Sequence, residues 1–207
     1  MNNKKLFLAC AAVLAMAAVG PASAAGAGSW VFKVGVHNVN PKSDNGSLAD
    51  GALDVEIGGN TRPTIGLGYW LTDNVQLDIL GAIPFQHDLK LNGADAGDFK
   101  HLPPTVTVQY HFNPAGDINP FVGVGLNYTL VYDESSAGPI AGTDLAIDNS
   151  FGVALQGGIE FKLNDKWSIA GDVRWMDIDS KVKVDGADVG TVNVDPIAVG
   201  IFAVYNF

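Results

Sequence analysis

One face of the last eleven residues, read as a strand, is apolar or aromatic throughout, and this period-two pattern restricts the fold more than any other feature. Every odd position from Ile197 to Phe207 is apolar or aromatic. A period of two puts these side chains on one face of a β-strand. About ten residues is the length of a tilted strand in a transmembrane barrel. The segment predicts such a strand, although an edge strand of a soluble sandwich fits this one segment equally well.

The beginning of the chain has the three parts of a secretory signal peptide. Two lysines precede an apolar run over residues 6–19, which is too short to span a bilayer, and a small-residue triplet ends at Ala24. We therefore expect a signal peptide at 1–24 and a single mature domain at 25–207. Cys10, the one cysteine, lies in the predicted signal peptide, so the mature protein is expected to have no disulfide.

Charge and composition narrow the class of partner and of fold. Removal of the predicted signal peptide leaves 10 of the 12 basic residues against 22 acidic ones, which gives a mature net charge of −12. Such acidity argues against a nucleic-acid partner. The 25 glycines, with short apolar segments between turn signals, favour an all-β fold.

Eight segments carry the period-two pattern, and no helical period of similar strength occurs in the mature chain. Three connections are short: 72–74, 113–120 and 164–166. Four are long and rich in Gly, Asp and Ser: 40–60, 84–104, 133–148 and 179–194. Short periplasmic turns and long extracellular loops are typical of outer-membrane barrels. We predict an up-and-down barrel of antiparallel strands at Trp30–Val39, Thr61–Leu71, Val75–Ile83, Thr105–Phe112, Phe121–Tyr132, Asn149–Leu163, Trp167–Ile178 and Asp195–Phe207.

The outward faces of these segments suit a bilayer. In the sixth segment every odd residue from Phe151 to Leu163 is apolar or glycine. A charge at the middle of the lipid face costs about 2–4 kcal/mol, and the outward set contains none. Aromatic residues gather at the predicted periplasmic strand ends, as in the girdle of a membrane barrel. They are Trp30, Tyr69, Trp70, Tyr110, Phe112, Phe121, Phe161, Trp167, Tyr205 and Phe207.

Several short motifs occur in order along nearly the whole mature chain. They are Gly68-Tyr69 with Leu71-Thr72-Asp73-Asn74, Pro84-Phe85 with His87, His101-Leu102-Pro103-Pro104-Thr105, the run from Pro120 to Thr129, Met176-Asp177-Ile178-Asp179 and Asp195-Pro196. Together they resemble the OmpW family of small outer-membrane proteins. The resemblance implies an eight-stranded barrel with a largely hydrophobic lumen that passes small apolar molecules, and alkane-uptake proteins are relatives. It implies no particular substrate.

The side chains expected inside the barrel divide into a charged set and an apolar set. The inward charges, three of each sign, are Lys33, Asp78, Glu160, Lys162, Asp172 and Arg174. The predicted lining of the upper lumen is apolar: Leu80, Ala82, Met176, Ala198 and Phe202. An eight-stranded barrel is only wide enough for its own side chains or one small ligand. We expect an apolar funnel open to the outside and closed below by ion pairs, which are costly to separate.

A solute in such a funnel is expected to leave sideways into the bilayer. The weakest seam lies between the third and fourth strands, near Pro84, Pro103 and Pro104, because proline cannot donate a ladder hydrogen bond. Arg174 departs from the apolar upper lumen, and an ion pair with Asp172 is preferred to a contact with a polar ligand. The expected partners are therefore the lipid bilayer and small apolar solutes.

The C-terminal strand signal, Tyr205 with Phe207, predicts recognition by the barrel-assembly machinery. Two other functions stay open. A non-conducting structural or surface-interaction barrel, acting through its outer loops, also fits paired inward charges. A soluble lipocalin-like carrier fits a Gly-x-Trp start at Gly28, but its outer wall should be polar.

No pattern of catalytic, cofactor-binding or metal-binding residues stands out, and we predict no enzyme and no cofactor. The histidines are His37, His87, His101 and His111. A metal site of His87, His101 and Asp88 at the outer rim is conceivable, but solvated loop histidines are the preferred interpretation. A Ser-His pair from distant strands, as in barrel lipid hydrolases, stays open.

Overall fold

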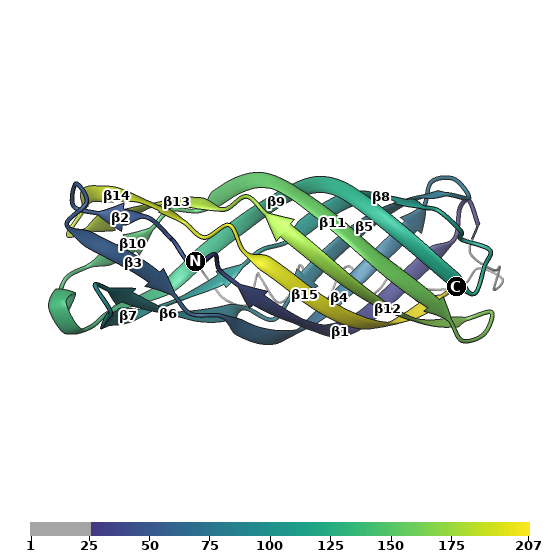
Figure 1. Ribbon diagram of the computed structural model, residues 1–207, viewed down its shortest axis with the longest axis horizontal. Helices are drawn as coiled ribbons and strands as arrows, with labels where there is room; N and C mark the ends of the chain where they lie inside the picture. Colours follow the sequence, from purple (N-terminus) through teal and green to yellow (C-terminus); the bar gives the residue numbers. More distant parts are fainter. Residues whose placement is uncertain (1–25) are drawn as a thin grey trace.

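The computed structural model describes residues 26–207, and its main part is a closed barrel (Figure 1). The predicted signal peptide and its cleavage site lie outside the described residues. Residues 26–207 include no helix that could span a bilayer. The barrel strands are β1 (Trp30–Asn40), β4 (Asn60–Trp70), β5 (Val75–Ala82), β8 (Thr105–His111), β9 (Ile118–Ser136), β11 (Ser150–Lys162), β12 (Trp167–Met176) and β15 (Ile197–Asn206).

The eight barrel strands pair antiparallel in the order of the chain. The ladder runs β1, β4, β5, β8, β9, β11, β12 and β15. It closes where β15 pairs with β1, as in the register Val34 to Ala203. Closure leaves no open sheet edge, which is what a strand-built protein needs in lipid, since an unpaired backbone group has no water there. The predicted eight-stranded antiparallel barrel is confirmed.

Side chains alternate between the two faces of the wall as the sequence pattern predicts. In β15 the odd residues Ile197, Val199 and Ile201 are about half exposed, while Ala198 and Phe202 are buried. β11 and β12 show the same alternation along the part of each strand that lies in the middle of the barrel. The outer wall is therefore an apolar belt that acyl chains can cover.

Two of the aromatic residues expected in the girdle point into the barrel instead. Trp70 is 2% and Phe121 is 4% exposed. His111 lies between them, with ring centroids 4.6 Å from Trp70 and 5.0 Å from Phe121. Trp70 follows Tyr69, and neighbours on a strand face opposite sides, so only one of the two can reach the headgroups. Near the periplasmic end, these rings form an aromatic layer inside the lumen.

The long connections are not irregular loops, because most of their residues form further strands. Figure 1 shows them at the left end, opposite the short turns and the C-terminus. One helical turn, η1 (Gly138–Ile140), accompanies them. The strands are β2 (Ser47–Leu48), β3 (Leu53–Ile57), β6 (Phe85–Leu91), β7 (Ala94–Leu102), β10 (Leu145–Ile147), β13 (Asp179–Val184) and β14 (Ala187–Asn193).

Turn chemistry explains two of the hairpins in this extracellular extension. Asn92 and Gly93 connect β6 to β7 with φ of 50° and 76°. Asp185 and Gly186 connect β13 to β14 with φ of 50° and 80°. Positive φ at both central residues is the type I′ hairpin turn, for which Asn-Gly and Asp-Gly are the preferred pairs. Both pairs are visible in the sequence, so this signal could have predicted the hairpins.

The extension continues the barrel as two separate sheets. One contains the upper part of β9 with β7, β6, β3 and β2, and the other contains β10, β13 and β14. The backbone N–H of Ala49 donates to Val189 O at 2.8 Å, which joins the sheets beside β2 and β14. Their inward side chains make an apolar core that includes Leu48, Leu89 and Phe99.

Candidate functional site: the interior of the barrel

The middle of the lumen is crossed by a network of buried charges, here called the waist. Lys33 Nζ lies 2.7 Å from Asp78 Oδ1, and Arg174 Nη2 lies 3.8 Å from Asp78 Oδ2 and 3.2 Å from Asp172 Oδ2. All four side chains are at most 9% exposed. These charges come from β1, β5 and β12, so only barrel closure brings them together. Two cations and two carboxylates balance the charge of the waist.

Two further side chains complete the coordination of Asp172. His37 Nε2 lies 3.1 Å from Asp172 Oδ1, and Gln156 Nε2 donates to Asp172 Oδ2 at 2.6 Å. Because an ionised carboxylate can only accept, the His37 Nε2 carries the proton of this contact. His37 Nδ1 lies 2.9 Å from Thr64 Oγ1, whose hydroxyl can donate to it. His37 is thus satisfied on both ring nitrogens, and its place at the waist was not predicted.

A chain of hydrogen bonds leads from the waist toward the periplasmic end. Gln109 Nε2 donates to Gln156 Oε1 at 2.8 Å. Beyond Gln109 come His111 and Asn119, whose Nδ2 donates to His111 Nδ1 at 2.8 Å. Every member is at most 7% exposed. With the aromatic layer of Trp70, His111 and Phe121, these side chains fill the lower lumen.

Glu160 and Lys162 are not part of the waist, although the alternation along β11 places both on the inward face. Both are half-buried, at the periplasmic end of β11. Lys162 Nζ lies 3.1 Å from Asp165 Oδ1, in the neighbouring turn. They line a polar cavity of about 140 Å³, open at this rim, together with Asn119, Ser168 and Asn206. Of the six predicted inward charges, the structure brings four together in the waist.

The predicted apolar lining residues fall into two clusters. Leu80 and Phe202 pack in one with Trp70. Ala82 packs against the other, which contains Met176 and Ala198 and also Phe85 and Ile178. Phe202 also lies edge-on to the His37 ring, with centroids 4.8 Å apart. The first cluster therefore contacts the waist, and the second connects to the extracellular extension through Ile57, which packs against both the second cluster and the extension core.

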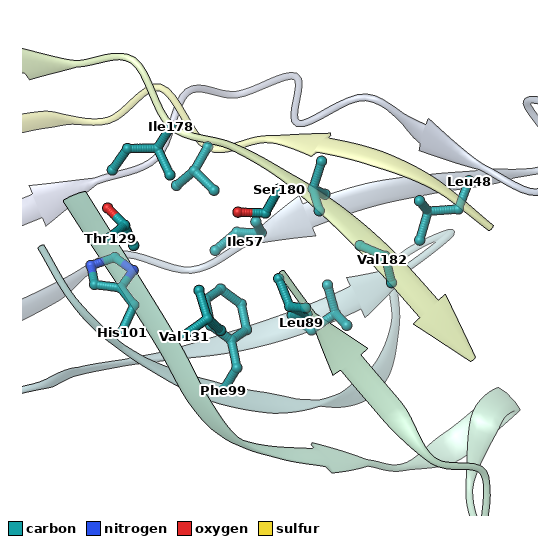
Figure 2. Close-up of a pocket in the computed structure, with 13 residues that line it drawn as sticks. Leu48, Ile57, Leu89, Phe99, His101, Thr129, Val131, Ile178, Ser180 and Val182 are labelled. Carbon is teal, nitrogen blue, oxygen red and sulfur yellow. The ribbon is translucent and has the colours of Figure 1, made fainter. Parts of the chain in front are cut away.

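An apolar cavity lies where the barrel passes into the extension (Figure 2). Its volume is about 10 Å³, room for about one water-sized sphere. The lining includes Ile57, Phe99, His101, Ile178 and Ser180. The upper lumen is thus closely packed rather than an open funnel.

All four histidines are buried, so the preferred interpretation of solvated loop histidines is wrong. His87 is 0% and His101 is 1% exposed, and their ring centroids are 4.6 Å apart. Burial lowers the pKa of His87, and burial with the adjacent His87 holds the pKa of His101 well below its usual value. His87 Nδ1 donates to the Gly58 carbonyl. Both imidazoles are therefore neutral at neutral pH.

The conceivable rim metal site of His87, His101 and Asp88 is not formed, because Asp88 is exposed on the opposite face of β6. Elsewhere in the described chain, carboxylate oxygens of Asp177, Asp179 and Asp195 lie within 4.8 Å of one another. Lys42 Nζ already lies 2.9 Å from Asp195 Oδ2. This cluster is a set of outer-rim carboxylates with a lysine as counter-charge.

The barrel wall contains a gap in its ladder, here called the window, between residues 81–84 and 102–104. The pairing of β5 with β8 ends at Leu80 and Thr105, and the pairing of β6 with β7 begins at Phe85 and His101. Between these limits the backbone groups on each side of the gap form hydrogen bonds with the strand on their other side, not across the gap. Ile83 N–H donates to Pro63 O at 3.1 Å, and Tyr128 N–H donates to Pro104 O at 3.1 Å.

Comparison with known proteins identifies the family. The model of the OmpW family matches residues 26–207. The chain belongs to the OmpW family. Outer membrane protein W of Vibrio cholerae is 35% identical over 195 residues, covering 89% of this chain and 90% of the relative. The protein is therefore an outer-membrane barrel of the OmpW type, as the resemblance predicted.

Two solved structures have the same architecture. The crystal structure of OprG from Pseudomonas aeruginosa aligns with a TM-score of 0.80 and 26% identity, covering 89% of this chain and 98% of OprG. The solid-state NMR structure of AlkL, which shares its name with a relative from Ectopseudomonas oleovorans, aligns with a TM-score of 0.70 and 25% identity. It covers 93% of this chain and 97% of AlkL.

Proposed function

We propose that this OmpW-family barrel takes up small apolar molecules from outside the cell and releases them sideways into the outer membrane. The observation that carries the proposal is the division of the interior. Apolar side chains, including Ala82, Met176 and Ala198, occupy the lumen above the waist. Buried ion pairs close it below. A hydrocarbon gains nothing by entering the waist, and separating its charges is costly.

The window supports a lateral exit at the right level. Its lower limit is Leu80, whose side chain is buried, and the side chain of Phe85 at its upper limit belongs to the upper apolar cluster. Ile83, on the outer side, is 55% exposed on the face that meets lipid. Opening here breaks no ladder bond between β5 and β8.

Uptake by intact cells tests the proposal, because the outer leaflet is then the barrier to the solute. Leu80→Asp and Phe202→Asp put a charge in the apolar lining, and we expect each to abolish uptake of n-octane. Asn164→Asp, in the exposed periplasmic turn that follows β11, is the matched control and should leave uptake unchanged. Heat-modifiable migration on gels checks that each barrel is folded. Normal uptake by both folded lining variants would contradict the proposal.

The window has a test of its own. Pro84→Val and Pro103→Val together supply two backbone N–H groups, with which the edges can form ladder bonds. We expect uptake of n-octane to slow while the barrel stays folded. A rate equal to that of the unmodified protein would exclude the window as the exit.

A second candidate function is a structural or surface-interaction barrel that acts through its extracellular extension. The close packing of the lumen favours it, since the upper cavity holds only about 10 Å³. Under this alternative the unmodified protein gives no uptake above cells that lack it, and the lining variants change nothing.

We further propose that the barrel-assembly machinery recognises the last strand. Tyr205 and Phe207 pack edge to face, with ring centroids 5.0 Å apart. Phe207→Ala is expected to slow assembly in cells without changing the folded barrel, as measured by the fraction that is heat-modifiable over time. An unchanged rate of assembly would contradict this role.

A further inference from the structure

The cavity below the extracellular extension is apolar on nearly all sides. Side chains from both sheets of the extension form its walls, and Figure 2 shows them around a common centre. The residues that reach it include Leu48, Leu89, Val131, Val182 and Val192. Such a surface binds hydrocarbon without preference for one compound. Selectivity must come from the few polar groups in the lining.

Two polar atoms in this lining have no hydrogen-bond partner in the described chain. They are His101 Nε2, from β7, and Ser180 Oγ, from β13. The residues are 1% and 3% exposed. Figure 2 shows the Ser180 hydroxyl directed among the lining side chains and the His101 ring beside Thr129. Thr129 is already engaged, since its hydroxyl donates to Asn127 Oδ1 at 2.7 Å.

An unpartnered buried polar group is costly, so a pair of them in an apolar cavity points to a ligand that satisfies them. The rings around His101 are those of Phe85, His87 and Phe99, at centroid distances of 5.6, 4.6 and 6.3 Å. These neighbours offer no carboxylate, and the imidazole stays neutral for the reasons given above. A charged ligand head would therefore be buried without a counter-charge.

We propose that this cavity binds an uncharged molecule with an apolar body and one hydroxyl group, hydrogen-bonded to His101 Nε2 and Ser180 Oγ. A hydroxyl group can donate to one of these atoms and accept from the other. The proposal rests on the uptake function, and it names the class of solute that is selected on the outer side of the waist.

The ligand enters by parting the two sheets of the extension, because the cavity itself has room for only about one water. Between β9 and β10, hydrogen bonds to side chains take the place of backbone ladder bonds. Val131 N–H donates to Asn149 Oδ1 at 2.9 Å, and Ile147 N–H donates to Glu134 Oε1 at 3.2 Å. Backbone bonds join the sheets on the other side, where Asn193 N–H donates to Asn45 O at 3.1 Å. The side next to β9, which side chains hold, is therefore the one expected to open.

Binding to the full barrel in lipid nanodiscs tests the inference. Cyclohexanol and methylcyclohexane have nearly the same shape, and they differ by a hydroxyl in place of a methyl group. Shifts of the His101 imidazole nitrogens in NMR spectra report occupancy of the cavity. We expect cyclohexanol to bind at least several-fold more tightly than methylcyclohexane, and cyclohexanecarboxylate to bind more weakly than cyclohexanol.

Substitutions at the two polar atoms should remove this preference. Ser180→Ala is expected to reduce it by roughly 2- to 12-fold, the range for one net hydrogen bond, while Ser180→Thr retains it. In the His101→Phe barrel the imidazole signal is absent, so NMR shifts of the Ile178 methyl group report occupancy of the cavity instead. We expect this variant to lose the preference for cyclohexanol to the same extent. Ser47→Ala, on the exposed side of β2, is the matched control.

The outcomes separate this inference from the uptake function. Equal binding of the two compounds, or a preference that survives both variants, overturns the hydroxyl site. If cells still take up methylcyclohexane in that case, the uptake function stands alone. If neither compound binds and neither is taken up, both proposals are overturned.

Discussion

Loss of a carboxylate from the waist should destabilise the barrel more than loss of a cation. Asp172→Asn leaves Lys33 and Arg174 facing only Asp78, so one buried positive charge has no counter-charge. Removal of one partner from a buried ion pair costs about 3–5 kcal/mol. Arg174 Nε and Nη1 have no hydrogen-bond partner in the described chain. The guanidinium therefore has no other acceptor to replace the lost Asp172 carboxylate. We expect a decrease of about 4 kcal/mol in the free energy of unfolding.

Arg174→Met should cost less, although it removes a charge from the same pair. The two carboxylates that remain keep other partners, because Asp78 Oδ1 still lies 2.7 Å from Lys33 Nζ and Asp172 still contacts His37 Nε2 and accepts from Gln156 Nε2. In the double variant Asp172→Asn with Arg174→Met, the waist has no unmatched charge. We expect its stability to lie within about 2 kcal/mol of the unmodified barrel, since a buried pair replaced as a unit is often close to neutral.

Reversible urea unfolding in phospholipid vesicles, followed by tryptophan fluorescence, measures these differences. Comparable m-values for all variants establish that the unfolding free energies can be compared. Asp165→Asn is the control, because it breaks the exposed contact with Lys162, and exposed pairs contribute less than about 1 kcal/mol. The account of the waist is refuted if Asp172→Asn is no more destabilising than the control, or if the double variant is as unstable as Asp172→Asn.

Three further predictions concern the extension, the wall and the lipid face. Burial lowers the pKa of His87 and His101, so these imidazoles bind protons more readily in the unfolded extension than in the folded one. The free energy of unfolding of the extension is therefore highest above about pH 6.5, and it decreases as the pH falls toward the folded pKa values. Hydrogen exchange of β6 and β7 should therefore accelerate on acidification, and it should accelerate less in His101→Phe; an equal acceleration would contradict this cause. Gly125→Ala should destabilise the barrel by about 1–3 kcal/mol, because the added Cβ would lie 1.9 Å from Val106 O. Gly157→Ala is the control, since its Cβ would meet nothing within 4 Å. Equal urea midpoints for the two variants would disprove the steric argument. In single-tryptophan variants, lipids with brominated acyl chains should quench Trp167, which is 46% exposed, and spare the buried Trp70; strong quenching of Trp70 would mean that it faces lipid.

A pH effect confined to the extension would also bear on uptake. Protonation of two adjacent imidazoles puts like charges next to the proposed hydroxyl site, in a cavity that otherwise has apolar walls. Opening of the extension and loss of ligand binding should then occur over the same range of pH. The barrel wall below the window should remain folded over that range, because its closed ladder does not include β6 or β7.

The barrel and the two faces of its wall could be predicted from the amino-acid sequence. The alternation in β15 and β11 predicted which face meets lipid, and all eight predicted strands overlap the observed ones. Period two is a local property of an extended chain, so it can be read without knowing which strands pair. For the same reason, strand parity alone puts Trp70 and Tyr69 on opposite faces, and the girdle prediction overlooked it.

The arrangement of the interior, in contrast, depends on contacts between residues that are far apart in the chain. His37 and Asp172 are 135 positions apart, and Lys33 and Asp78 are 45 positions apart. Parity indicates that such side chains point inward, but their relative height depends on strand tilt and register around the closed ladder. The same holds for His101 and Ser180, which meet one cavity only because the connections fold into two sheets above the barrel. Local patterns fix the face of each residue, whereas neighbours across the lumen are fixed by closure.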